Sequence, residues 1–383
     1  MAFYKISIKT SLTMLNLKGL NPLISTRSSN TRAITFLLTE VLATITVASS
    51  LFTKTLEADS VVDNISGIVF SIQTICKEVT MLLCRDEFVA LLNYVEEFWP
   101  VNEFGIESGT NIRNIQKSTS KALKIFRCLL LMCTVIIISE PFFAEGRQFP
   151  VSWIDISCIQ TSLICYGVIY GFLCGCTIGL VIFLSLIDGL FFNLLSYGYC
   201  ELEQVKYALF NLSIDGDVRG DQVETLREIA VLVRHHVTSL EYVQRVKKLM
   251  SKVMLYQFSS SLFTLCTGLY VLTYQGFPPS VEAAVKFVPF VACAAFQIFA
   301  YCVAGQKISE QTESIANAAY ECRWWFKHQP RLQRSICLII QRSHRRIVLS
   351  AGGLWNLDMD TFIRILKASF SLLTFMQTMY IPE

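Results

Sequence analysis

The sequence predicts an all-α membrane protein with seven transmembrane helices, its amino terminus in the cytoplasm and its carboxyl terminus outside the cell. Three observations support this prediction: the composition, the number of long apolar segments and the distribution of Lys and Arg. Hydrophobic residues make up 53% of the 383 residues and charged residues only 16%, well below the roughly 25% of an average soluble domain. The lipid bilayer is therefore the first partner that the sequence predicts.

Seven apolar segments are long enough to cross a hydrocarbon core of about 30 Å, which takes roughly 20 helical residues. They lie near 32–53, 61–83, 124–143, 161–187, 254–274, 285–304 and 357–380. The second is the weakest of the seven, because it contains Asn64, Gln73, Lys77 and Glu78. The fourth is the longest, and its length allows the helix to continue beyond the membrane.

The positions of Lys and Arg predict the orientation, because cytoplasmic loops carry an excess of them. The amino-terminal segment and every second loop after it hold 26, whereas the alternate loops hold only Lys54, Arg147 and Lys286. The amino terminus is therefore expected in the cytoplasm.

The sequence contains two N-glycosylation sequons. The one at Asn64 would lie at the outer end of the second segment and is expected to accept a glycan, whereas the one at Asn211 would face the cytoplasm.

Other function classes find little support. The formal net charge of +3 and the lack of a basic run interleaved with aromatics argue against a nucleic-acid partner. Hydrolase, nucleotide-binding and metalloprotease motifs are absent, so we predict no catalytic residue, no cofactor and no metal. His235 and His236 are adjacent, which puts them on different helix faces, and their simplest interpretation is as solvated cytoplasmic histidines.

The fourth segment carries four glycines, Gly167, Gly171, Gly175 and Gly179, at a spacing of four residues. Such a stripe of small residues predicts tight helix packing, with a cavity wall as the alternative. Tyr166 and Tyr170 lie on the neighbouring stripe and would suit an apolar pocket with a few polar anchors. From depth alone, the candidate ligand-binding residues are Phe70 and Ser71 on the second segment, Tyr166 and Tyr170 on the fourth, and Cys266 and Tyr270 on the fifth.

In the closing segment, a row of five polar residues interrupts an apolar helix. At 100° per residue, Arg364, Lys367, Ser371, Thr374 and Thr378 fall within one arc of about 80°, whereas Gln377 lies about 60° outside it. A row of this kind is unfavourable against lipid and should face protein or water. It is either a polar seam buried against neighbouring helices or the wall of an aqueous pore. A pore would require an oligomer, because one helix cannot enclose it.

The carboxyl-terminal part of the sequence resembles the insect odorant receptors. The matching elements, in order, are Gly305-Gln306, Glu313-Ser314, Ala319-Tyr320, Trp324, the basic run Arg342–Arg346, Ala351-Gly352-Gly353, Phe362, Leu366-Lys367 and Phe370-Ser371. Together they cover about 70 residues. The short central cytoplasmic loop is similar to that of the ligand-tuning subunits and unlike that of the longer olfactory co-receptor.

This resemblance implies an odorant-gated, non-selective cation channel that forms a tetramer with the olfactory co-receptor in the plasma membrane of olfactory sensory neuron dendrites. A small volatile odorant would bind in the outer half of the bundle. The last helix would line the central pore, with Ser371, Thr374 and Thr378 on the conduction path and a gate at Met376, Gln377 and Thr378. Family members often carry a Leu-Leu-Arg-Gln-like run where this chain has Phe375-Met376-Gln377-Thr378. Whether Gln377 or Thr378 faces the ion is therefore open, although the helical angles favour Thr378.

The chain is accordingly divided into six parts. They are a cytoplasmic amino-terminal segment (1–31), transmembrane helices 1–4 (32–187), a cytoplasmic helical extension and loop (188–253), transmembrane helices 5 and 6 (254–304), a cytoplasmic anchor region (305–356) and the pore-lining helix with a short extracellular tail (357–383). The alternatives are an insect gustatory receptor channel, whose last-span pattern this chain does not match, and a G-protein-coupled receptor, which starts outside the cell. A secondary transporter would more often show internal repeats and broken helices.

Overall fold

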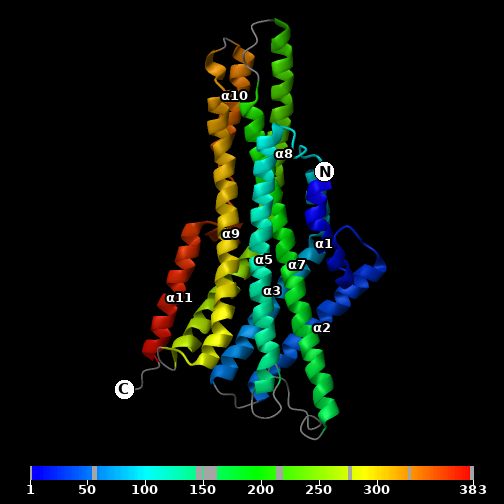
Figure 1. Cartoon of the computed structure of the whole chain (residues 1–383), viewed down its shortest axis with the longest axis vertical. Coiled ribbons are helices and arrows are strands. Elements are labelled where there is room, and N and C mark those ends of the chain that lie inside the picture. Colours follow the sequence, from blue (N-terminus) through cyan, green and yellow to red (C-terminus); the bar gives the residue numbers. More distant parts are fainter. Residues whose placement is uncertain are drawn as a thin grey trace.

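A computed structural model describes residues 2–53, 58–143, 149, 162–212, 219–274, 278–326 and 329–379, and these are almost entirely helical (Figure 1). The elements, in chain order, are α1 (Ala2–Lys18), α2 (Arg27–Thr53), α3 (Ala58–Leu83), α4 (Arg85–Glu96), α5 (Gly105–Phe143), α7 (Leu163–Phe210), α8 (Arg219–Tyr274), α9 (Val281–Glu321), the short 3-10 helix η1 (Trp324–Phe326), α10 (Pro330–Ser343), the strands β1 (Ser350–Ala351) and β2 (Trp355–Asn356), and α11 (Met359–Met379).

The predicted apolar segments lie in seven different helices: α2, α3, α5, α7, α8, α9 and α11. Five of the described helices are long and apolar enough to cross a membrane by length and composition: Arg27–Leu51, Asn64–Leu83, Gly105–Phe142, Leu163–Phe210 and Val281–Glu321. The apolar parts of α8 and α11 are less hydrophobic, because α8 contains Gln257 and three consecutive serines and α11 contains Arg364 and Lys367.

Four helices continue well past their apolar segments and make the molecule long and narrow. In Figure 1, α5, α7, α8 and α9 run along much of the long axis, and α10 lies at the end far from the carboxyl terminus. Helix α7 alone has 48 residues, and from Leu184 to Val205 every residue except Tyr199 is buried. Over these residues α7 is therefore the central helix of the core.

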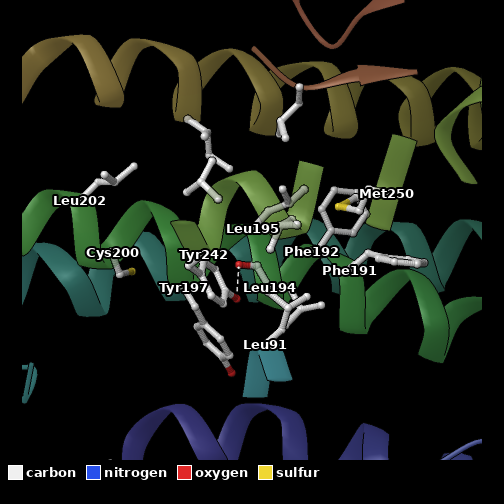
Figure 2. Close-up of a cluster of buried hydrophobic side chains, with 14 of the residues drawn as sticks. Leu91, Phe191, Phe192, Leu194, Leu195, Tyr197, Cys200, Leu202, Tyr242 and Met250 are labelled. Atoms are coloured by element: carbon white, nitrogen blue, oxygen red, sulfur yellow. Dashed lines mark hydrogen bonds between the residues drawn. The ribbon is translucent and has the colours of Figure 1, made fainter. Parts of the chain in front are cut away.

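The core around α7 is packed by large side chains from α4 and α8. Figure 2 shows Phe191, Leu194 and Tyr197 of α7 together with Leu91 of α4 and Tyr242 of α8. The Tyr242 hydroxyl donates a hydrogen bond of 2.9 Å to the backbone carbonyl of Leu194. The polar end of this buried ring is thereby paired, as is usual for a buried tyrosine.

The expectation that His235 and His236 are solvated is wrong. The His235 ring stacks on Trp99 with centroids 3.7 Å apart, and its Nδ1 lies 3.0 Å from Oε1 of the buried Glu201. His236 is 2% exposed, and its Nε2 lies 3.4 Å from the Ser343 hydroxyl of α10. Both rings of α8 therefore pack against residues of neighbouring segments and are not solvated.

His236 makes stability depend on pH. Burial, together with the nearby Arg342, lowers the pKa of His236 from 6.5 to about 4. The folded protein therefore binds fewer protons here than the unfolded chain, and stability falls as the pH drops below about 6.5. Linkage gives a loss of about 2 kcal/mol in the free energy of unfolding at pH 5.

Thermal unfolding of the purified protein at pH 7.5 and pH 5 should show a smaller pH effect in His236→Leu than in the wild type. His344→Leu, which alters an exposed histidine, should behave as the wild type; equal pH effects in all three proteins would contradict the prediction.

A tight turn precedes α11 and fixes where that helix begins. Gly352 and Gly353 both have positive φ, 60° and 74°, in the hairpin that pairs β1 with β2. Such angles favour glycine. Gly305 of α9 lies so close to Leu357 that an added Cβ would be 2.4 Å from its carbonyl oxygen. Gly305, Gly352 and Gly353 of the recognised sequence pattern therefore hold the base of α11 against α8 and α9.

Candidate ligand cavity and pore-facing helix

A cavity of about 290 Å³ lies between α2, α3, α5, α7, α8 and α9. This volume is close to the lower end of the range for small-molecule sites, roughly 300–1,000 Å³. Much of the wall is apolar and includes Val47, Phe70, Leu173, Val181, Phe287 and Phe290. An apolar wall favours an apolar ligand body by burial, at about 25 cal/mol per Å².

The cavity wall also contains charged side chains. Glu140 of α5 and Lys286 of α9 form an ion pair of 2.7 Å. Glu40 of α2 pairs with Lys18 of α1, which also pairs with Glu78 of α3. Lys18 and Glu78 are buried. The amino-terminal helix is therefore anchored to the bundle beside the cavity through one ammonium group shared by two carboxylates.

A buried polar network forms the floor of the cavity. Asp188 of α7 accepts hydrogen bonds from Lys77 Nζ at 2.6 Å, Gln297 Nε2 at 2.6 Å and the Tyr301 hydroxyl at 2.8 Å. Gln257 of α8 links Lys77 to Gln297, with distances of 2.7 and 2.8 Å. The network therefore joins α3, α7, α8 and α9 around one ion pair that is balanced in charge.

The network extends to the cavity surface. Gln73 donates 2.6 Å to Gln257 Oε1 and accepts from Ser260 at 2.6 Å, and Gln257 also donates to Ser261 at 2.9 Å. Gln73, Ser261 and Gln297 all line the cavity. A ligand at the cavity floor would therefore contact residues that connect four helices.

The structure distributes the six candidate ligand-binding residues over three locations. Phe70 and Ser71 line the cavity. Tyr166 and Tyr170 lie outside its lining, where the Tyr170 hydroxyl donates 2.6 Å to the carbonyl of Ile138 and the Tyr166 ring packs on Phe149. Cys266 and Tyr270 lie on the side of α8 that faces α11.

Two further expectations need correction. Asn64, expected to carry a glycan, is 2% exposed within α3 and lines the cavity. A glycosylated asparagine must project into solvent, so this position does not suit a glycan in the folded protein.

The glycine stripe of α7 does not pack tightly within the described chain, because a Cβ added at Gly167, Gly171, Gly175 or Gly179 would meet nothing within 4 Å. The stripe faces away from the bundle.

Helix α11 is held by one narrow stripe of side chains. Thr361, Ile365, Ser369 and Leu373, each four residues apart, are its buried residues, and α11 packs on α8 and α9. The polar row Arg364, Lys367, Ser371, Thr374 and Thr378 is exposed along its whole length. Within the described chain the row is therefore not a buried seam, and it is available to water or to another subunit. The side chains of Met376 and Gln377 lie outside the described residues.

One aromatic side chain connects the cavity to α11. Phe287 of α9 lines the cavity and also belongs to a buried cluster with Tyr270 and Val271 of α8 and Leu373 of α11. No sequence motif marks Phe287. Only the helical phases of α8, α9 and α11 taken together could have pointed to it.

The fold and the cavity define a multi-span helical membrane protein with a cavity of small-molecule size between its helices and a polar row exposed on α11. A sequence profile described as "7tm Odorant receptor" matches residues 57–370. The chain therefore belongs to the odorant receptor family, which is a family of receptors and not of enzymes. The match favours this family over the gustatory receptor and G-protein-coupled alternatives.

Individual relatives agree with the family match. Odorant receptor 13a of Drosophila melanogaster is 21% identical over 88% of this chain and 87% of its own length. Odorant receptor 22b of the same species is 24% identical over 48% of this chain and 45% of its own length. The olfactory receptor OR5 of Machilis hrabei, solved in complex with eugenol, superimposes with a TM-score of 0.83 at 15% identity, covering 99% of both chains. At that identity the superposition shows the fold.

Proposed function

We propose that this odorant receptor is a ligand-tuning subunit of an odorant-gated, non-selective cation channel. The observation that carries the proposal is the combination of a cavity between the helices with an exposed polar row on α11, connected through Phe287. A small volatile odorant would bind in the cavity, and α11 would line the conduction path. The complex of the Machilis receptor with eugenol supports a small organic ligand for this fold.

The orientation with a cytoplasmic amino terminus has two supports. One is the excess of Lys and Arg in alternate loops. The other is Cys165, at the start of α7, which is disulfide-bonded. Disulfides persist in oxidising surroundings, so this end of α7 belongs outside the cell. As α7 is the fourth crossing, the amino terminus then lies in the cytoplasm and the carboxyl terminus outside.

The oligomer is the second part of the proposal. A pore lined by α11 needs further subunits, and the resemblance to the family suggests a tetramer with the olfactory co-receptor. Exposed apolar side chains at the far end of the molecule, Tyr320 of α9, Trp325 of η1 and Leu338 of α10, suit a subunit contact. We assign this end to the cytoplasmic anchor region, 305–356, and keep the other predicted segment boundaries. The resemblance to the family supports plasma-membrane residence in olfactory sensory neuron dendrites as a further part of the proposal.

The hydroxyls of the row suit cations. Thr374 donates its hydroxyl hydrogen to the carbonyl of Ser371 and Thr378 to that of Phe375, each at 2.8 Å. The oxygen lone pairs are then left for the exposed side, where they can replace part of the hydration of an ion. We propose that Ser371, Thr374 and Thr378 line the pore and that the gate lies at Met376–Thr378.

Gating would work through differential affinity, because a ligand shifts an equilibrium only when it binds one state more tightly. An odorant that packs against Phe287 changes the surroundings of the cluster that holds Leu373. The floor network offers a second route, since it ties the cavity to α8 and α9, on which α11 rests. The open state would be the one in which the occupied cavity is better packed.

Recording currents tests the proposed function. Cells that express this chain with the co-receptor should show odorant-evoked, non-selective cation current that persists when G-protein signalling is blocked. Cells that express either subunit alone are the controls. Loss of the current under G-protein block would contradict the channel proposal, and odorant-evoked current from this chain alone would contradict the heteromer.

Replacing Phe287 by leucine tests the connection between cavity and pore helix. Phe287→Leu keeps an apolar side chain of similar volume, so the protein should fold. We expect the maximal current to fall several-fold at unchanged surface expression, because the contact shared with Leu373 is altered. Val288→Leu, at the neighbouring half-exposed position, is the matched control. An unchanged maximal current in Phe287→Leu would exclude this route.

A further inference from the structure

Two buried side chains of α3 line the cavity, and each has a polar atom without a hydrogen-bond partner among the described residues. Asn64 and Ser66 are both more than nine-tenths buried and both line the cavity. Asn64 Nδ2 and Ser66 Oγ form no hydrogen bond with any residue that the structure describes. An unpaired buried amide is unfavourable by about 1–3 kcal/mol. A group in the cavity that accepts a hydrogen bond would remove this penalty.

The other polar side chains of the wall are mostly paired within the protein. Ser71, Thr44, Thr134 and Thr177 donate to backbone carbonyls of their own helices. Gln73, Gln297 and Ser261 are committed to the floor network. Among the described residues, the Asn64 amide and the Ser66 hydroxyl are therefore donors that remain available to a ligand.

Space for such a ligand exists beside Asn64. Gly67, one helical turn further along the same face of α3, also lines the cavity, and a Cβ added there would meet nothing within 4 Å. Apolar side chains of Val47, Phe70 and Leu173 complete the wall. An apolar body with one oxygen directed towards Asn64 fits this arrangement.

The charges of the wall disfavour an anion. Lys286 is the only cation among the described residues that line the cavity, and Glu140 already pairs with it. Lys18 is shared by Glu40 and Glu78, and Glu40 Oε2 has no partner among the described residues. A carboxylate ligand would therefore meet carboxylates without a free ammonium group, and burying it there would be strongly unfavourable.

We propose that the cavity selects neutral molecules with an apolar body and one hydrogen-bond-accepting oxygen, such as a ketone or ester, which accepts a hydrogen bond from Asn64 Nδ2. Matched carboxylates are excluded and matched hydrocarbons bind more weakly. This assignment rests on the proposed odorant-receptor function and names the class of ligand at its site.

Ligand binding to the purified receptor complex tests the assignment without requiring a current. The probes are four compounds of nearly the same shape: acetophenone, ethylbenzene, benzoate and 1-phenylethylamine. Binding is measured from the concentration dependence of the thermal shift. In the wild type, acetophenone should bind about five- to tenfold more tightly than ethylbenzene, as expected for one hydrogen bond to a buried donor. Benzoate should produce no shift.

Asn64→Leu should remove the preference for acetophenone. The acetophenone carbonyl loses its hydrogen-bond donor, and bound ethylbenzene no longer leaves a buried amide unpaired. Asn64→Ala repeats the measurement if the leucine variant folds poorly. Ile72→Leu, on an exposed position of α3 outside the cavity, should keep the wild-type preference. Equal binding of acetophenone and ethylbenzene in the wild type, an undiminished preference in Asn64→Leu, or tighter binding of the amine or of benzoate would overturn the assignment. Selective binding without any evoked current would support it and would contradict only the channel proposal.

Discussion

Thr378→Arg is expected to abolish odorant-evoked cation current while leaving surface expression unchanged. Thr378 is exposed on α11 and is the outermost member of the polar row. A guanidinium group there would place a fixed positive charge, one per subunit of this kind, on the proposed conduction path. Near a narrow pore such charges repel cations over several ångströms, because water cannot fully screen them.

Leu373→Arg provides the contrast on the opposite side of the same helix. Leu373 is buried with Tyr270, Val271 and Phe287, so an arginine there would have to be buried unpaired. We expect surface expression itself to fall. Whole-cell current and surface labelling, measured in the same cells, separate the two variants. Normal current in Thr378→Arg would mean that the polar row is not the wall of the pore.

Asp188→Ala is expected to destabilise the fold strongly and to lower surface expression. Asp188 is fully buried and accepts hydrogen bonds from Lys77, Gln297 and Tyr301. Its removal would leave the Lys77 ammonium buried without a counter-charge, which costs about 3–5 kcal/mol in comparable pairs. Such a loss is a large part of the 5–15 kcal/mol that stabilises a typical domain.

Surface expression and thermal unfolding measure this effect. Asp188→Ala should give little protein at the surface, whereas the double variant Lys77→Met with Asp188→Leu should recover part of it, because no unpaired charge remains. Glu87→Ala breaks the exposed pair with Arg245, 3.3 Å apart, and should change stability by less than about 1 kcal/mol. Wild-type stability of Asp188→Ala would refute the structural role of the network.

The second apolar segment illustrates how far the sequence could be interpreted. Its four polar residues made it the weakest candidate, yet it forms α3, and each of them has a place inside the bundle. Gln73 and Lys77 belong to the floor network, Glu78 pairs with Lys18, and Asn64 lines the cavity. Hydropathy treats each polar residue as unfavourable, because partners on other helices are not visible in a single segment.

The candidate ligand-binding residues also show what a single segment of sequence does not reveal. Tyr170 shares a helical face of α7 with the cavity residues Leu173 and Thr177, but it lies further out, where Ile138 accepts its hydroxyl hydrogen. Cys266 lies two residues from the cavity residue Thr264 and so points to a different side of α8. The rotation of each helix about its axis depends on its neighbours, which a single segment of sequence does not reveal.

The polar row of α11 was predictable because it depends only on the helical period. Its angles already separated Ser371, Thr374 and Thr378 from the buried stripe, and the structure places these three residues on the exposed side. The choice between a buried seam and an exposed wall needed the packing of α8 and α9 against α11. That packing uses Thr361, Ile365, Ser369 and Leu373 and leaves the polar row uncovered.

The central claim is that odorant opens a cation path lined by the polar row of α11. Cysteine accessibility during channel activity tests it most directly. Thr374→Cys is expressed with the co-receptor, and a charged thiol reagent is applied during odorant-evoked current. Ser369→Cys, on the buried stripe of the same helix, and the wild-type chain with its native cysteines are the controls. We predict irreversible block in Thr374→Cys and none in the controls. Unblocked current in Thr374→Cys, at a position where labelling is demonstrated, would contradict the claim.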